Sequence, residues 1–169
     1  MEIQHALTTR RSIRKYTQEK VPDIQINNML EAAMYAPSAN NKQPWHFVII
    51  RNKETLEQIP IFHPNAKMIK DASLGILVCT DDDIENSVGY WIQDCAAATQ
   101  NILLSAHGMG LGAVWCGIFP REERIVGIKK LFSLPQNITP FSLISIGHPD
   151  EQKEQPQRFS KERIHIEKW

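Results

Sequence analysis

Hydrophobic side chains recur at helical spacing in three parts of the chain. Over 23–36 they repeat every three to four residues, directly after Pro22, which is typical of a helix start. A shorter repeat predicts a first helix around Ile3–Leu7. Residues 87–107 form the longest helical segment, with small and apolar side chains on one broad face. A face this wide predicts burial in the domain centre or in a subunit interface, and we favour the interface.

Apolar stretches without the helical repeat predict strands, and the continuous run at 74–80 predicts a buried one. The strands are predicted at 45–50, 74–80, 113–118 and 141–147. Two short helices are predicted within 53–72, and a polar helix at 120–130 carries Pro120 in its first turn, where proline is tolerated. The mixture, without an internal repeat or a shift in composition, predicts one α+β domain over 1–169 with 149–169 as an extended tail.

Charge and cysteine content narrow the function classes. The 169 residues include 19 Lys and Arg against 19 Asp and Glu, so no global charge attracts nucleic acid or an anionic membrane. Cys79, Cys95 and Cys116 are odd in number and form no C-x-x-C pair, which predicts reduced thiols. Neither a signal core nor an apolar run of about 18 residues is present, so we expect a cytoplasmic protein without a membrane span. The scattered histidines predict no metal site.

The sharpest local feature is a basic cluster at Arg10, Arg11, Ser12 and Arg14. Guanidinium groups match phosphate oxygens, and a serine hydroxyl adds a further donor. If the first helix continues, Arg10 and Arg14 lie four residues apart on one face. Two other interpretations stay open: a solvated basic helix end, and an RNA-binding stripe, which the neutral net charge disfavours.

A polar loop bounded by prolines covers 37–44. Asn40, Asn41 and Gln43 carry donors and acceptors that suit the edge of a flat heterocycle, although such a segment is also typical of an ordinary loop. Trp45 either stacks on a ligand or fills the core.

Glycines at 108, 110 and 112 precede Ala113 and satisfy G-x-G-x-x-A. The dinucleotide-binding motif needs a strand before it and a helix after it, whereas here a predicted helix precedes and a predicted strand follows. We therefore interpret these glycines as the end of the long helix. Gly117, which has no side chain, lets a flat ring approach the main chain.

These pieces, in this order, resemble the FMN-dependent nitroreductase family. The resemblance extends from about residue 5 to the end of the chain, and its strongest stretches are 10–16, 36–47, 94–101, 110–117 and 158–169. It implies an α+β fold with a central, mostly antiparallel sheet of four to five strands flanked by helices, in an intertwined homodimer. Two FMN molecules would lie in the dimer interface, each touched by both subunits. The chain departs from the family at Ala39, where a second hydroxyl residue is frequent, and at Cys116, where many members are acidic.

The resemblance also implies a set of cofactor-binding residues. On one subunit they are Arg10, Arg11, Ser12, Arg14, Trp115, Cys116, Gly117 and Arg158, and the loop that reaches in from the second subunit supplies Pro37, Ser38, Ala39, Asn41 and Gln43. A main-chain N–H near Gly117 would donate toward flavin N5, and Arg14 would place positive charge at the pyrimidine edge. No side chain is needed as a nucleophile. For Cys116 we favour packing over a thiol that acts on the flavin, because free cysteines are commonly buried.

The implied activity is hydride transfer from NADH or NADPH, through FMN, to a nitroaromatic, a quinone or a similar small acceptor by a ping-pong mechanism. Two alternatives remain. One is a flavin-binding sensor or carrier, and the other is a specialised relative that removes halide or fragments the flavin.

Overall fold

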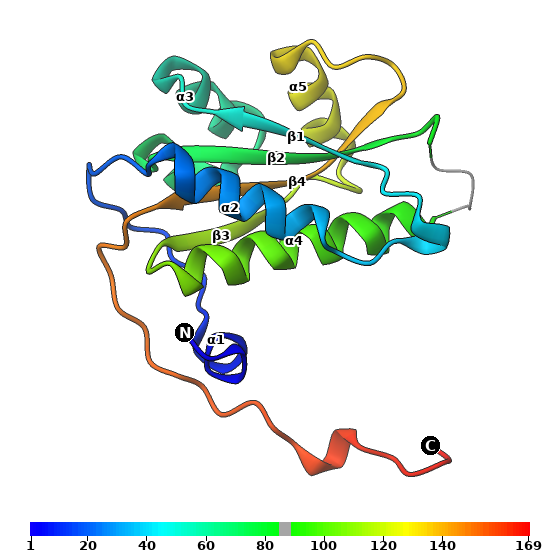
Figure 1. Ribbon diagram of the computed structural model, residues 1–169. Coiled ribbons are helices and arrows are strands. Elements are labelled where there is room, and N and C mark those ends of the chain that lie inside the picture. Colours follow the sequence, from blue (N-terminus) through cyan, green and yellow to red (C-terminus); the bar gives the residue numbers. More distant parts are fainter. Residues whose placement is uncertain (85–88) are drawn as a thin grey trace.

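Four antiparallel strands form one sheet at the centre of the computed structural model, which describes residues 1–84 and 89–169 (Figure 1). The strands are β1 (Trp45–Ile50), β2 (Leu74–Asp81), β3 (Gly112–Gly117) and β4 (Ile138–Gly147). Their order is β1-β2-β4-β3, and each neighbouring pair is antiparallel. The predicted α+β fold with an antiparallel sheet of four strands is confirmed. Because β3 is an edge strand, its outer main-chain groups face away from the sheet.

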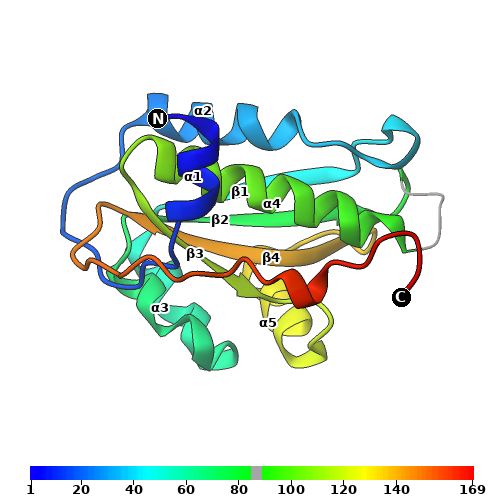
Figure 2. The same cartoon turned by 90° about the horizontal axis from the view of Figure 1, so that it is seen from below.

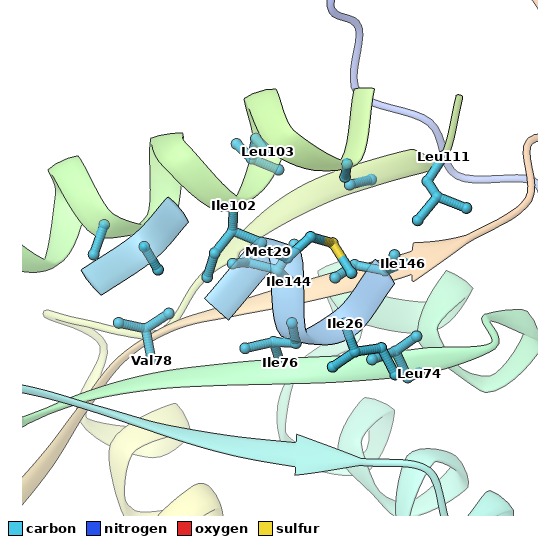
Figure 3. Packing of buried hydrophobic residues seen from close by; sticks show 14 of the residues in the cluster. Ile26, Met29, Leu74, Ile76, Val78, Ile102, Leu103, Leu111, Ile144 and Ile146 are labelled. Atoms are coloured by element: carbon cyan, nitrogen blue, oxygen red, sulfur yellow. The ribbon is translucent and has the colours of Figure 1, made fainter. Parts of the chain in front are cut away.

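Helices cover both faces of the sheet. Helices α2 (Asp23–Met34) and α4 (Tyr90–Gly108) pack on one face, and α3 (Lys53–Phe62), the 3₁₀ segment η2 (Pro64–Asp71) and α5 (Glu122–Phe132) lie on the other (Figures 1 and 2). Successive side chains of a strand point to opposite faces, so Ile76 joins the α2–α4 core and Leu77 joins the α3–α5 core. Figure 3 shows the α2–α4 core, where Ile26, Met29, Ile102 and Ile144 interlock with Ile76.

Most predicted elements start or end within a few residues of their observed bounds. The helix predicted over 23–36 begins at Asp23, whose carboxylate stabilises the first turn of α2. The predicted pair of short helices within 53–72 is present as α3 and η2. The long helix begins at Tyr90, and the part predicted at 87–88 lies outside the described residues.

The prediction for the last helix is wrong in one respect. Pro120 does not occupy its first turn, because the chain first makes a turn closed by the Arg121 N–H donating to the Ile118 carbonyl, and α5 begins only at Glu122. The strand predicted at 141–147 also begins earlier, at Ile138, and pairs there with Asp81.

Two terminal segments lie outside the layered body. Helix α1 (Ile3–Thr9) buries none of its residues, and the chain after β4 extends away with a single short 3₁₀ turn, η3 (Lys161–Arg163) (Figure 1). Both expose large apolar side chains, namely Ile3, Leu7, Phe159, Ile164, Ile166 and Trp169. Within the described residues, the helices are too short or too polar to cross a bilayer.

Candidate functional site

The basic segment after α1 lies along the open edge of β3. Helix α1 ends at Thr9, so the condition under which Arg10 and Arg14 would share a helix face is not met. Instead Ser12 forms a parallel bridge with Ala113, and the Ile13 N–H donates to the Ala113 carbonyl over 3.0 Å. This short pairing fixes the segment beside the strand that carries Trp115, Cys116 and Gly117.

The beginning of the tail holds the basic segment from its other side. The Arg14 N–H donates to the Glu151 carboxylate over 2.5 Å, and Lys153 Nζ donates to the Ser12 carbonyl over 2.7 Å. Arg11 Nε donates to the Glu154 carbonyl over 2.9 Å. Most of the Arg11 donors thus bond main-chain carbonyls of its own chain. We therefore assign Arg11 chiefly to holding this segment in place.

The guanidinium group of Arg10 lies near enough to those of Arg11 and Arg158 for their charges to act on it. Burial, and then the charges of Arg158 and Arg11, lower the pKa of Arg10. Arg10 Nε and Arg11 Nη2 are buried without a hydrogen-bond partner among the described residues, where no carboxylate forms a salt bridge with any of the three. Cations this close, with unused donors, are stabilised by an anion, and phosphate oxygens fit guanidinium donors well.

A cavity of about 570 Å³ opens at the other end of β3 and brings Arg14 together with Trp115, Cys116 and Gly117. A Cβ atom at Gly117 would meet nothing within 4 Å, so the main chain borders open space. A flat ring can lie against this stretch of backbone, as the lack of a side chain at Gly117 predicts.

Cys116 is a packing residue in this structure. Its sulfur lies 3.9 Å from Met68 Sδ and belongs to the core on the α3–α5 face. Burial raises the pKa of the thiol to about 11, so it is protonated at neutral pH and a poor nucleophile. The adjacent Trp115 points to the opposite core, where its ring meets Phe141 edge-on with centroids 5.6 Å apart.

Four polar residues of the cavity escaped the sequence analysis. His63, Asn65 and Lys67 come from the turn between α3 and η2 and from η2 itself, and Arg124 comes from the first turns of α5. Lys67 and Arg124, together with Arg14, make the cavity strongly basic. The break between the two short helices at Pro64 was a usable signal, because polar residues at a helix break often line a site. Nothing in the sequence pattern indicated that α5 would meet the same cavity.

The 37–43 loop is compact and internally bonded. Asn40, Asn41 and Gln43 have positive φ angles of 51°, 54° and 50°, a conformation that most side chains avoid. Ser38 Oγ accepts from the Gln43 N–H over 3.0 Å, and Gln43 Nε2 donates to Asn41 Oδ1 over 3.0 Å. Non-glycine residues held in this region are common at binding sites, where surrounding bonds offset the strain.

A buried carboxylate anchors the same loop. The Ala39 N–H donates to Asp94 Oδ1 on α4 over 3.0 Å. Trp45, which follows the loop, is buried in the α2–α4 core, so its core-filling interpretation is the one the structure supports. The loop therefore presents a fixed surface that includes Pro37 and the Ser38 hydroxyl, whose proton remains available to a ligand.

The 37–43 loop and the start of the basic segment lie at opposite ends of α4 (Figure 1). Asp94 holds the loop near the start of the helix, whereas His107 near its end forms a 2.8 Å hydrogen bond with Thr9, next to Arg10. Asp94 and His107 are thirteen positions apart along the helix, which is about 20 Å. One copy of the chain therefore leaves the loop far from Arg10, whereas the chain just after β3 lies toward the start of α4, where Trp91 meets Phe119 with ring centroids 4.8 Å apart.

Gly112 allows the close approach of the basic segment to β3. A Cβ at this position would lie 2.6 Å from Ile13 Cγ2. We expect Gly112→Ala to displace the segment, to lower the free energy of unfolding by about 1–3 kcal/mol, and to weaken binding of the implied FMN at least about tenfold. Urea unfolding and a fluorescence titration with FMN measure the two effects.

Gly108→Ala is the matched control, because a Cβ at Gly108 meets nothing within 4 Å. We expect it to be neutral or slightly stabilising, since alanine favours the helix end more than glycine does. Wild-type FMN affinity in Gly112→Ala would contradict the placement of the segment.

Acid should destabilise the fold through His63. Burial, and then the charge of Arg124, lower the pKa of His63, so the folded protein holds it neutral while the unfolded chain binds a proton near the ordinary pKa of about 6.5. Stability is thus fully present above about pH 6.5 and falls as the pH drops toward the lowered pKa, by up to about 1.4 kcal/mol per pH unit. Urea unfolding of the protein between pH 7.5 and 5 measures this slope.

His63→Gln should flatten the slope, because it removes the buried titrating group. Burial also lowers the pKa of His107, so part of the slope should remain. His165→Gln, which changes an exposed histidine that stacks on Trp169 in the tail, is the control. An identical slope in wild type and His63→Gln would contradict a neutral, buried His63.

Comparison with known proteins identifies the family of this chain. The Nitroreductase family profile matches residues 7–61 and 61–148. The chain is 50% identical over 169 residues, all of this chain and 88% of the relative, to a protein of Methanothermobacter thermautotrophicus provisionally named NADH dehydrogenase/NAD(P)H nitroreductase. The chain belongs to the nitroreductase family.

Two solved structures have the same fold over nearly the whole chain. One is a protein of Clostridium acetobutylicum provisionally named NADH oxidase, with a TM-score of 0.94, 42% identity, and coverage of 97% of this chain and 99% of that one. The other, from Desulfovibrio desulfuricans, is provisionally named a nitroreductase and was solved in complex with FMN, with a TM-score of 0.87, 32% identity, and coverage of 100% and 98%.

Proposed function

We propose that this chain is an FMN-dependent oxidoreductase that passes hydride from NADH or NADPH to a small acceptor such as a nitroaromatic or a quinone. The observation that carries the proposal is the cluster of Arg10, Arg11 and Arg158, whose buried donors have no carboxylate partner among the described residues. It lies on the same strand edge as the open main chain at Gly117.

The residues present fit FMN. The guanidinium cluster, with Ser12, would hold the phosphate, and the open backbone from Trp115 to Gly117 would receive the ring. The names of the related proteins, which include NAD(P)H nitroreductase, and the FMN complex of the Desulfovibrio protein support both the cofactor and the electron donor.

When bound, FMN supplies the hydride chemistry, and the protein supplies position and charge. The Gly117 N–H would donate toward N5 of the ring. Arg14, which lines the cavity, would face the pyrimidine edge and stabilise the negative charge that develops there on reduction. The cavity is open to solvent on one side, so donor and acceptor can occupy it in turn, which favours ping-pong kinetics.

We infer that the complete site needs two copies of the chain. A two-fold axis that pairs α4 helices in antiparallel fashion would bring the 37–43 loop of one copy next to the guanidinium cluster of the other. This arrangement would let two parts of the site that lie about 20 Å apart along α4 in one copy contribute to the same flavin. The exposed apolar side chains of α1 and of the tail would then pack against the second copy.

The three cysteines are free thiols in the structure, which supports the proposal that the protein works in the reducing cytoplasm. No buried nucleophile is required by the proposed chemistry, in keeping with the raised pKa of Cys116.

An anaerobic titration tests the proposed activity. FMN-loaded protein should lose its yellow absorbance within seconds of adding one equivalent of NADH or NADPH per site, and should regain it on addition of menadione or a nitroaromatic. Steady-state rates should give parallel double-reciprocal lines. A flavin spectrum that neither nicotinamide bleaches would contradict the oxidoreductase and favour a carrier, and fragmented flavin or released halide would favour a specialised relative.

A further inference from the structure

The carbonyl oxygen of Gly117 is held by a partly buried cation. Arg124 Nη1, from the first turns of α5, donates to it over 2.7 Å. Arg124 Nε is enclosed without a hydrogen-bond partner, and no carboxylate within the described part of the chain forms a salt bridge with this guanidinium. A hydrogen bond from a charged donor is stronger than one between neutral groups, so this bond is the principal polar anchor of Arg124.

His63 lies against the same pair of groups. Its side chain is 1% exposed, and neither ring nitrogen has a hydrogen-bond partner among the residues described. Burial and the Arg124 charge lower the pKa of His63, whereas the Gly117 carbonyl and Glu123 oppose the shift in part. The imidazole is therefore neutral at pH 7 and adds no second positive charge beside Arg124.

Arg124 bonds the carbonyl end of the peptide unit that joins Gly117 to Ile118. Gly117 ends β3 and has no side chain, while the Ile118 N–H of the same unit, like that of Phe119, donates to the Phe141 carbonyl. Without Arg124, this unit would keep the bond to Phe141 but lose the one at its carbonyl end, which frees the oxygen to tilt toward the cavity. An oxygen turned inward would repel a ring that carries developing negative charge.

We propose that Arg124 is a positioning residue for the flavin ring: by bonding the Gly117 carbonyl, while the Ile118 N–H of the same peptide unit bonds Phe141, it keeps the carbonyl oxygen out of the ring's place, with His63 as its uncharged neighbour. The proposal rests on the proposed function. It concerns residues of α3 and α5 that contact the strand end and not the phosphate cluster.

Arg124→Met and Arg124→Lys test the proposal, with Arg121→Met as the matched control because Arg121 is exposed and does not line the cavity. We expect Arg124→Met to weaken FMN binding about tenfold and to shift the midpoint potential of the bound flavin to a more negative value. Arg124→Lys, which keeps the charge, should recover most of both, and Arg121→Met should match the wild type. Fluorescence titration, dye-coupled potentiometry and the melting temperature of the apoprotein are the readouts.

A lowered melting temperature in Arg124→Met with wild-type FMN affinity and potential would overturn the proposal, because it would mean a structural role alone. If Arg124→Met does not fold, wild-type values for Arg124→Gln, which lacks the charge, overturn it equally. A wild-type protein that binds no FMN refutes the proposed function itself, and so the two failures are distinguishable.

The pH dependence of FMN binding gives a second readout. Protonated His63 would repel Arg124 and loosen its hold on the Gly117 carbonyl, so we expect FMN affinity of the wild type to fall as the pH drops below neutral. His63→Gln, which has no imidazole to protonate, should lose part of this acid weakening when its affinity at each pH is compared with its own affinity at pH 7.5. The same pH profile in both proteins would contradict the coupling between His63 and Arg124.

Discussion

Arg10→Ala should weaken FMN binding by about 2–3 kcal/mol, or about 30- to 150-fold. Arg10 is the centre of the guanidinium cluster: its charge is opposed by Arg158 and Arg11, its Nε is buried, and no carboxylate partner is present in the described residues. A phosphate that accepts charge-assisted hydrogen bonds from this site loses one of its main donors in the variant. Isothermal titration of the apoprotein with FMN measures the loss.

The same substitution should not destabilise the apoprotein, which separates binding from folding. Removing one of three neighbouring cations relieves repulsion, so urea unfolding of apo Arg10→Ala should show equal or greater stability than the wild type. Arg121→Ala, at an exposed position before α5, is the control and should change neither quantity. Unchanged FMN affinity in Arg10→Ala would contradict the proposal that the arginine cluster binds the phosphate.

Mixed dimers should recover the binding that each single lesion destroys. Ala39→Pro removes the N–H that donates to Asp94, which breaks this hydrogen bond between the 37–43 loop and α4 and should distort the loop at a cost of about 1–3 kcal/mol. If each site combines the loop of one subunit with the arginines of the other, a dimer of one Arg10→Ala chain and one Ala39→Pro chain has one site with both lesions and one with neither. We expect about half the wild-type FMN capacity at wild-type affinity.

Differently tagged chains, purified by both tags in turn, give the mixed dimer for this titration. The two homodimers should each bind FMN at least about tenfold more weakly than the wild type. Ala39→Ser keeps the N–H and should behave as the wild type. A mixed dimer without any tight site would mean that the loop and the arginines of one subunit serve the same flavin, against the separation along α4.

The sheet and its helices were predictable because their signals are local. The apolar run at 74–80 and the repeat over 23–36 each report on burial within one element, and both elements appear within a few residues of the expected bounds. The role of the glycines also followed from local order: the long helix ends at Gly108 and a strand begins at Gly112, as the rejected dinucleotide motif would not allow.

The rest depended on contacts between distant segments. Arg10 and Arg14 would share a face only if the first helix continued, but pairing of Ser12 with Ala113, about a hundred residues away in the chain, makes the segment extended. His63 and Arg124 meet at the Gly117 carbonyl only because α3 and α5 pack on one face of the sheet, and no periodicity of the sequence reports such a meeting. Pro120 was misplaced because a turn and the start of a helix tolerate proline alike.

Parallel titrations of the apoprotein with FMN and riboflavin test the central claim, that the chain holds a flavin by its phosphate at the arginine cluster and by its ring at the end of β3. We predict that FMN binds at one per subunit and that riboflavin, which lacks the phosphate, binds at least about a hundredfold more weakly. Equal binding of the two flavins, or binding of neither, would contradict the account.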